Sequence, residues 1–161
     1  MEHDERTLFE RYLEELEPGD RFVHWPGRTM TEWQNDFFSL ATMNHQPLHI
    51  DRAYSAASQH GQRLVNGLLV LSTAVGMSIP NLSGAVIANL AYERVAHHAP
   101  VFIGDTIYAE TVVLDIRPSR SKPDRGIVHV ETRVTNQNQE LVLTYERRFM
   151  LPRRPSRSTI G

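Results

Sequence analysis

The sequence has no cysteine, and this absence excludes disulfides, thiolate zinc sites and cysteine nucleophiles. It also lacks an apolar run long enough to span a bilayer and the pattern of a secretory signal peptide. The formal net charge of -2 gives no overall attraction to nucleic acid, because basic residues gather only at 117–125 and near the C-terminus. We therefore expect a cytoplasmic protein with no nucleic-acid partner and no membrane partner.

The apolar content is sufficient for one core. Of the 161 residues, 40% are hydrophobic and 22% are charged, which is typical of a single globular domain. Residues 153–159 are arginine, proline, serine and threonine only, so they cannot contribute to a core. We expect one domain over residues 1–152 and a disordered tail over residues 153–161.

The hydrophobic periodicity predicts helices in the first half of the chain and strands in the second. Helical spacing of apolar residues occurs at 8–16, after the capping-box pair Thr31 and Gln34, and at 53–59. A further helix, apolar nearly all round, runs from about 65 to 79 and ends at Pro80. A strand begins at 21–25, and strand-like runs separated by turn residues follow at 85–95, 105–117, 126–135 and 141–151.

Together these elements predict an α+β domain in which a curved antiparallel sheet wraps around the long apolar helix. The sequence shows no internal repeat and no second domain. Exposed sheet edges favour pairing with a second copy, so we expect a homodimer or a larger assembly of dimers.

The segment Thr42–Asp51 concentrates groups that transfer protons. It contains two imidazoles, two amides and a carboxylate, and His49 directly follows Pro47-Leu48. Imidazole suits proton transfer at neutral pH, and the proline restricts the backbone that presents it. His49 is therefore the candidate general acid or base, although a lone histidine more often bonds to the backbone of a loop.

Each polar neighbour of His49 has a structural alternative. Asn44 either caps the preceding helix or holds a water or substrate oxygen, and its amide cannot act as a base. For Asp51, N-capping of a helix that begins at Arg52 is favoured over catalysis. His45 is either a second proton carrier or an exposed loop residue.

Gly67 lies near the start of the apolar helix, where backbone N–H groups lack intrahelical partners. Without a Cβ, it would let a thioester carbonyl approach an N–H group that can stabilise a developing oxyanion. Close packing of the helix on the sheet would need glycine equally. Arg120 and Lys122 lie on a polar loop, where they either grip phosphates or belong to a solvated hairpin.

The histidines do not predict a metal site. His45 with His49, and His97 with His98, lack a carboxylate that would complete a ligand set. Adjacent histidines on a strand also face opposite ways. We expect no metal and no cofactor.

Asn44–Asp51, Val65–Gly67 and Pro100–Asp105 together carry a resemblance to a known family. They are similar to the Asp-x-Asn-Pro-Leu-His-x-Asp segment, the small-residue turn and the third-strand entry of the MaoC-like hydratases, which are hotdog-fold proteins. The resemblance covers nearly the whole domain. It implies a single hotdog domain that adds water across the double bond of an α,β-unsaturated acyl-CoA, or removes it, with CoA as part of the substrate.

By this resemblance His49 is the catalytic histidine and Gly67 is the glycine of the oxyanion hole. Asn44 stands where the family has its catalytic aspartate, which removes one of the usual proton-transfer groups. Three accounts stay open: His49 performs both proton transfers through the water, His45 or Asp51 substitutes, or catalysis has been lost.

Residues 27–32, 42–44 and 121–128 resemble a subgroup that acts on branched dicarboxylyl-CoA thioesters, of the mesaconyl-CoA and itaconyl-CoA hydratase type. The extra carboxylate of such a substrate needs a cationic or amide partner. The candidates for that partner are Arg28, Arg63, Asn44 and His45. The residues expected to bind substrate are His45, Asp51, Asn66, Arg120 and Lys122.

Two other functions stay open. A hotdog acyl-CoA thioesterase would need a carboxylate base or nucleophile near the same helix, and no acid adjoins Gly67. The other is a non-catalytic acyl-CoA-binding subunit, in which the amide at Asn44 reflects the loss of catalysis.

Overall fold

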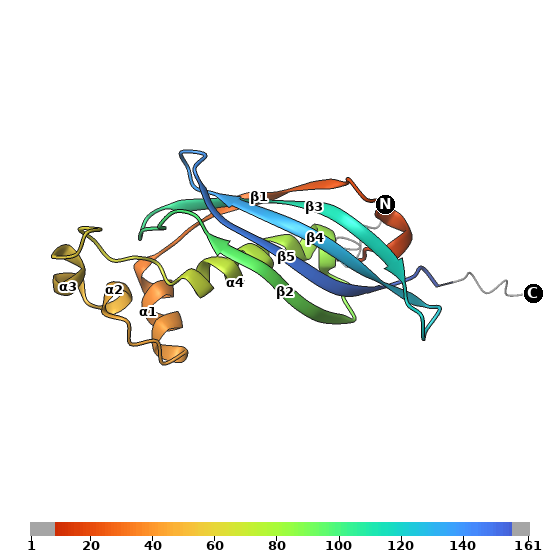
Figure 1. Cartoon of the computed structure of the whole chain (residues 1–161), viewed down its shortest axis with the longest axis horizontal. Coiled ribbons are helices and arrows are strands. Elements are labelled where there is room, and N and C mark those ends of the chain that lie inside the picture. Colours follow the sequence, from red (N-terminus) through yellow and green to blue (C-terminus); the bar gives the residue numbers. More distant parts are fainter. Residues whose placement is uncertain (1–8, 156–161) are drawn as a thin grey trace, which may run out of the picture.

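The computed structural model describes residues 9–155 (Figure 1). Its elements in chain order are the 3-10 turn η2 (Leu13–Glu15), strand β1 (Arg21–Thr29), helices α1 (Glu32–Ala41), α2 (Pro47–Ile50), α3 (Arg52–Ala56) and α4 (Gly67–Ser78), the π-helical turn η3 (Ile79–Ser83), and strands β2 (Ala88–His97), β3 (Thr106–Pro118), β4 (Arg125–Thr135) and β5 (Leu141–Pro152). The helices precede four of the strands, as the periodicity predicts.

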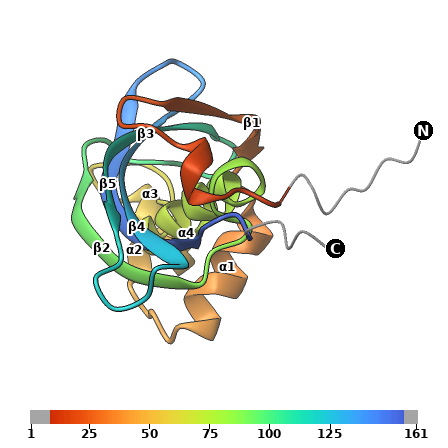
Figure 2. The same cartoon turned by 90° about the vertical axis from the view of Figure 1, so that its right-hand side faces the viewer.

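The strands form one antiparallel sheet in the order β1-β3-β4-β5-β2. This sheet curves around α4, which lies along its inner face (Figure 2). Alternate residues of the central strands are buried on that face, among them Val113, Val130 and Tyr145. The predicted α+β domain, a curved antiparallel sheet around a long central helix, is confirmed.

The hydrophobic core has two parts along α4. In the first, Leu69, Val70 and Ala74 of the helix pack with residues of β3, β4 and β5. In the second, Leu13 and Leu16 pack with Leu82 and with the other ends of the same strands. No helix within residues 9–155 has both the length and the hydropathy that crossing a bilayer requires.

The helix predicted over residues 8–16 is wrong, because the described part of this segment contains only the turn η2. Tyr12 is extended, and its N–H donates to the Glu15 carboxylate at 2.7 Å. Leu13 and Leu16 are buried in the core. Tertiary packing therefore overrides the apolar spacing, which is common in a segment too short to be a stable helix by itself.

Two helix boundaries also differ from expectation. The turn around Pro47 forms the short helix α2, in which Pro47 occupies the first helical position and needs no N–H partner. Pro80 does not end the helical path, because η3 continues through it. A proline in the first turn of such a segment removes no hydrogen bond that the segment needs.

The tail that is predicted to be disordered begins with two residues that have partners. The Arg153 N–H donates to the Asp124 carbonyl at 2.7 Å. The Arg154 N–H donates to the Glu14 carboxylate at 3.0 Å, and its guanidinium donates to Glu15 at 2.6 Å. These contacts join the end of β5 to the β3–β4 loop and to η2, whereas residues 156–161 lie outside the described part of the chain.

Candidate active site

A cavity of about 350 Å³ lies at the N-terminus of α4. Its walls are formed by His49, His60, Leu64, Val65, Gly67, Val70, His97, His98, Ala99, Pro100 and Val101. Four of these residues are histidines, and none of them is Asp, Glu, Lys or Arg. Largely apolar walls with a few convergent polar groups are typical of a site for a small organic ligand.

His49 lies on α2 and is held by the segment that precedes α4. Its Nδ1 is 3.0 Å from the Leu64 carbonyl oxygen, and because a carbonyl only accepts, Nδ1 carries the hydrogen. In the neutral ring Nε2 then has a free lone pair, which a general base requires. The Leu64 N–H donates to the Leu48 carbonyl at 2.9 Å, so Leu64 fixes both the backbone and the ring of this turn.

Gly67 supplies the one N–H of the first turn of α4 that has no partner within residues 9–155. The Leu68 N–H donates to the Asn66 side-chain oxygen at 3.0 Å, and the next two N–H groups donate to the Asn66 carbonyl. The macrodipole of this 12-residue helix is positive at the same end. The Gly67 N–H is therefore placed to stabilise an oxyanion on a ligand.

His97, the last residue of β2, lies against Gly67. A Cβ added at Gly67 would be 2.7 Å from Cε1 and 3.0 Å from Nε2 of His97, so the ring fits only over a glycine. The packing explanation of Gly67 is thereby confirmed, and the neighbour that needs the space is an imidazole in the cavity wall. Close packing and access to the backbone N–H occur at the same point of the helix.

The other two imidazoles of the wall have identified neighbours. His98 Nε2 lies 2.8 Å from the Thr144 hydroxyl. The His60 ring packs against Phe102 with 6.4 Å between ring centroids. No pattern in the sequence points to His60, because it follows a short helix in a polar stretch.

Asn44, His45 and Asp51, the predicted site residues that are neighbours of His49 in the sequence, do not line the cavity. The Asn44 side-chain oxygen accepts the Gln46 N–H at 3.1 Å, so this amide closes the turn before α2. Nor does Asn44 take the left-handed conformation after α1, which Met43 adopts with φ 54°. His45 is exposed. The Asp51 carboxylate accepts a backbone N–H of α3 at 2.9 Å, which confirms the predicted N-cap.

Asn35 holds the site together although no sequence motif includes it. It is fully buried in α1, its Nδ2 donates to the His49 carbonyl at 2.8 Å, and its Oδ1 accepts the Asn66 N–H at 2.8 Å. Asn66, expected to bind substrate, is itself buried and caps α4. The one hint in the sequence is that asparagine is a weak helix former in a predicted helix.

The predicted cations lie away from the cavity. Arg63 is buried and ion-pairs with Glu32 and with Asp36, the latter at 2.8 Å, so its charge is neutralised and it holds α1 against the segment before α4. Arg28 lines a different hollow, beside Gly76. Neither arginine is placed to pair with a carboxylate in the cavity.

Arg120 and Lys122 are exposed on the β3–β4 loop. This loop lies at the end of the sheet opposite to α2 and α3 (Figure 1). Within one chain, these two cations are therefore remote from His49. These cations can bind the phosphates of a ligand in this cavity only in an assembly of more than one chain.

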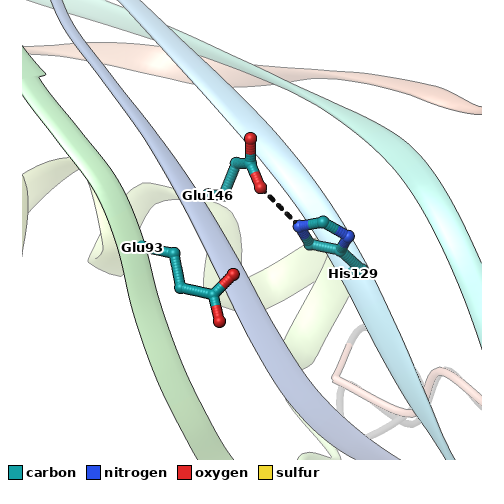
Figure 3. A group of neighbouring side chains, drawn as sticks. All are labelled: Glu93, His129 and Glu146. Carbon is teal, nitrogen blue, oxygen red and sulfur yellow. Dashed lines mark hydrogen bonds and ion pairs between the residues drawn. The ribbon is translucent and has the colours of Figure 1, made fainter.

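Figure 3 shows a cluster of carboxylates and an imidazole formed by Glu93, His129 and Glu146. His129 Nε2 is 2.7 Å from Glu146, which also accepts from Arg94 at 3.0 Å, and Glu93 accepts from Arg148 at 3.1 Å. Glu93 and Glu146 are directly opposite across β2 and β5, where like charges repel. Because the arginines neutralise both carboxylates, the cluster is a cross-strand ion-pair network, and we assign no metal to it.

Known proteins share this sequence pattern. The model of the family described as MaoC like domain matches residues 14–137. The mesaconyl-CoA hydratase of Haloarcula marismortui is 28% identical over 151 residues, which are 93% of this chain and 42% of that protein. The (R)-specific enoyl-CoA hydratase of Aeromonas caviae is 30% identical over 115 residues, which are 71% of this chain and 81% of that protein. The chain thus spans less than half the length of the mesaconyl-CoA hydratases that it matches.

Solved structures share the fold. A protein of Archaeoglobus fulgius described as a monoamine oxidase regulatory protein superposes with a TM-score of 0.80 at 33% identity, covering 90% of this chain and 96% of that chain. A Mycobacterium tuberculosis protein described as having a double hotdog fold gives a TM-score of 0.82 at 29% identity, covering 91% of this chain and 45% of that chain. The predicted hotdog fold is therefore confirmed.

Proposed function

Because the chain belongs to the MaoC-like domain family, we propose that it adds water to the double bond of a short enoyl-CoA thioester, or removes it. One observation carries this proposal: His49 and the free N–H of Gly67 border the same cavity. Relatives named mesaconyl-CoA hydratase and (R)-specific enoyl-CoA hydratase support the same class of reaction.

In the proposed reaction His49 Nε2 accepts a proton from the attacking water, because Nδ1 is engaged with Leu64. The thioester carbonyl oxygen accepts the Gly67 N–H. Negative charge that develops on this oxygen when the water adds to the β-carbon is then stabilised at the positive end of α4. CoA is part of the substrate, and the reaction requires no cofactor.

The finer proposal concerns the acyl group. The largely apolar wall suits a short acyl chain, and relatives named mesaconyl-CoA hydratase and beta-methylmalyl-CoA dehydratase support a branched dicarboxylyl-CoA substrate. In the described wall only imidazoles can carry a positive charge. They would have to pair with the extra carboxylate in place of Arg28 and Arg63.

We also propose that the working unit is a homodimer. β2 is an edge strand, and its large apolar residues Leu90, Tyr92 and Val95 are 45%, 45% and 39% exposed. Antiparallel pairing with the β2 of a second copy would extend the sheet and cover the β2 edge of each copy. Because the two β2 strands would run in opposite directions, opposite ends of the two sheets would lie side by side. Arg120 and Lys122 of the second copy would then lie at the end of the first copy that contains the cavity.

The reaction is tested with a spectrophotometric assay at the enoyl-thioester absorbance, using crotonyl-CoA, mesaconyl-CoA and itaconyl-CoA. Loss of absorbance supports the hydratase, and the order of kcat/KM among the three decides the acyl group. Release of free thiol would instead favour a thioesterase, although no carboxylate is among the described residues of the wall. Binding without turnover would favour a non-catalytic subunit.

The role of the loop cations is tested by charge reversal at Arg120 and Lys122. We expect a higher KM for the CoA substrate, because repulsion replaces attraction to its phosphates. The corresponding N-acetylcysteamine thioester lacks those phosphates and is the control. An equal effect on both substrates would show that the loop does not bind phosphate.

A further inference from the structure

The imidazole of His97 lies in the cavity wall beside Gly67. The His97 ring lies over Gly67, within 3.0 Å of the position that a Cβ would occupy. Within residues 9–155 this ring forms no hydrogen bond, whereas His98 is bonded to Thr144 and His49 to Leu64. A free imidazole and a free backbone N–H therefore border the same point of the cavity.

Hydration needs two proton transfers, one from the water and one to the α-carbon. The family resemblance would have an aspartate at Asn44, but an amide cannot transfer this proton, and its oxygen is engaged with Gln46. His45 and Asp51 do not line the cavity. Among the described residues of the wall, imidazoles are the remaining groups that can exchange a proton near neutral pH.

We propose that His97 is the second proton-transfer group of this site and that, in its protonated form, it donates the proton to the α-carbon. The proposal rests on the hydratase function above. His97 is favoured over His60 and His98 because its ring atoms are the nearest neighbours of a Cβ built at Gly67, where the thioester carbonyl and hence the adjoining α-carbon are held. The negative charge that develops on the thioester favours an imidazolium beside it.

The proposed hydration forms one C–O bond and one C–H bond. One O–H bond of water breaks, its proton goes to His49 Nε2, and the oxygen forms a bond to the β-carbon. The electron pair of the double bond takes the His97 proton and forms the new C–H bond at the α-carbon. The product is a 3-hydroxyacyl thioester, and solvent returns a proton from His49 to His97; dehydration runs through the same transfers in reverse.

The dependence of the reaction rate on pH would reflect the titratable groups that surround His97. In the cavity wall they are His49, His60 and His98, and no carboxylate, lysine or arginine is among the described residues of the wall. On the neighbouring strand β5, the residue paired with His97 is Leu143. An active site of this kind requires one imidazole to be neutral and another to be protonated, so its rate falls at both low and high pH.

The experiment compares wild type with His97→Phe and His97→Gln on the best enoyl-CoA substrate. Phe keeps a ring of similar size over Gly67, and Gln keeps a polar group, but neither transfers a proton. We expect kcat to fall about a hundredfold or more in both variants, with KM little changed and with the decline at high pH lost. His129→Gln, on the outer face of the sheet, is the control and should keep the wild-type kcat.

The outcomes separate the two proposals. If wild type hydrates an enoyl-CoA and both His97 variants keep at least half of its kcat, the role of His97 is overturned while the hydratase stands. Retained activity in His97→Phe alone, or a change confined to KM, would show that the ring only packs on Gly67 and would overturn the proposal as well. If wild type hydrates none of the substrates, both proposals fall.

Discussion

The cavity and the sheet use histidine in two different ways. In the sheet, His24 is 2% exposed, with Nδ1 3.1 Å from Asn81 and Nε2 2.7 Å from Thr111, and His129 is bonded to Glu146. In the cavity, His49 has a partner for one ring nitrogen, and His97 has none in the described part of the chain.

Hydrogen-bond partners and the place of the ring relative to the cavity together distinguish a structural histidine from a reactive one, because His129, like His49, has a partner for only one ring nitrogen in the described part of the chain. A ring whose nitrogens are both bonded, such as that of His24, is held in position and has no nitrogen free for a ligand. A ring with a free nitrogen can exchange a proton with a ligand. Residue type is the same in both regions, so the assignment depends on neighbours that come from distant parts of the chain.

Gly67→Ala is the substitution with the largest expected effect on this contrast. The added Cβ would lie 2.7 Å from the His97 ring, so the ring must move from its place beside the free N–H. A displacement of about 1 Å in a catalytic arrangement costs about a hundredfold in rate, and we expect kcat to fall by that order.

Gly76→Ala is the matched control on the same helix. Its added Cβ would have no neighbour within 4 Å in the described structure. We expect the wild-type kcat and a free energy of unfolding raised by about 0.5–1 kcal/mol, because alanine favours the helix. Equal kcat in the two alanine variants would show that His97 and Gly67 do not act together.

Asn35→Leu tests whether the reaction depends on how firmly His49 is held. It removes a hydrogen bond to the His49 backbone and changes no residue of the cavity wall. The substitution leaves the His49 carbonyl and the Asn66 N–H without their partner. Each buried group that loses its hydrogen bond costs about 1–3 kcal/mol, and two groups lose theirs, so urea denaturation should show the sum of the two costs. We also expect a lower kcat under conditions where the variant is folded; an unchanged kcat would mean that Asn35 supports the fold and not the reaction.

We expect the stability of the protein to depend on pH because of His24, which is buried in the sheet. Burial lowers the pKa of His24 from its ordinary value of 6.5; the hydrogen bond with Asn81 opposes this effect and the charge of Arg147 adds to it. Below pH 6.5 the unfolded chain therefore binds a proton that the folded chain does not, and stability falls as the pH falls. Thermal melts should show this decline in wild type and a smaller one in His24→Gln. Equal slopes would show that His24 is not its source.

Asp51→Ala has the smallest expected effect. It removes the N-cap of α3, which costs about 1 kcal/mol, and it should leave kcat unchanged because the carboxylate does not line the cavity. Asp51→Asn keeps a capping group and should recover most of the stability. A large loss of kcat in Asp51→Asn would indicate that the Asp51 carboxylate takes part in proton transfer.

The fold is predictable where a local pattern and the tertiary packing agree. Thr31 and Gln34 form the expected capping box at the start of α1, and β4 alternates between buried and half-buried residues. The segment that ends in η2 is different. Leu13 and Leu16 have helical spacing, but they fill the core from a single 3-10 turn and the extended residue that follows it. Propensity is a weak guide where a few buried contacts decide the conformation.

The site is only partly predictable for the same reason. His49 and Gly67 belong to local motifs, and the structure brings them to one cavity, while their catalytic roles stay predictions. His97 reaches the cavity because β2 pairs with β5 and ends beside α4, which no local pattern encodes. Asn44 shows the converse: its position in a motif suggests chemistry, but its side chain bonds within its own turn.

The most direct measurement is a paired comparison of His49→Gln and His129→Gln, with kcat for enoyl-CoA hydration and the melting temperature determined for each. Gln at position 49 can still donate to the Leu64 carbonyl but cannot exchange a proton. The account predicts that His49→Gln loses about 10²–10⁴-fold in kcat and keeps its melting temperature, whereas His129→Gln keeps its kcat and melts lower. Equal activity in wild type and His49→Gln would contradict the assignment of the cavity as the active site.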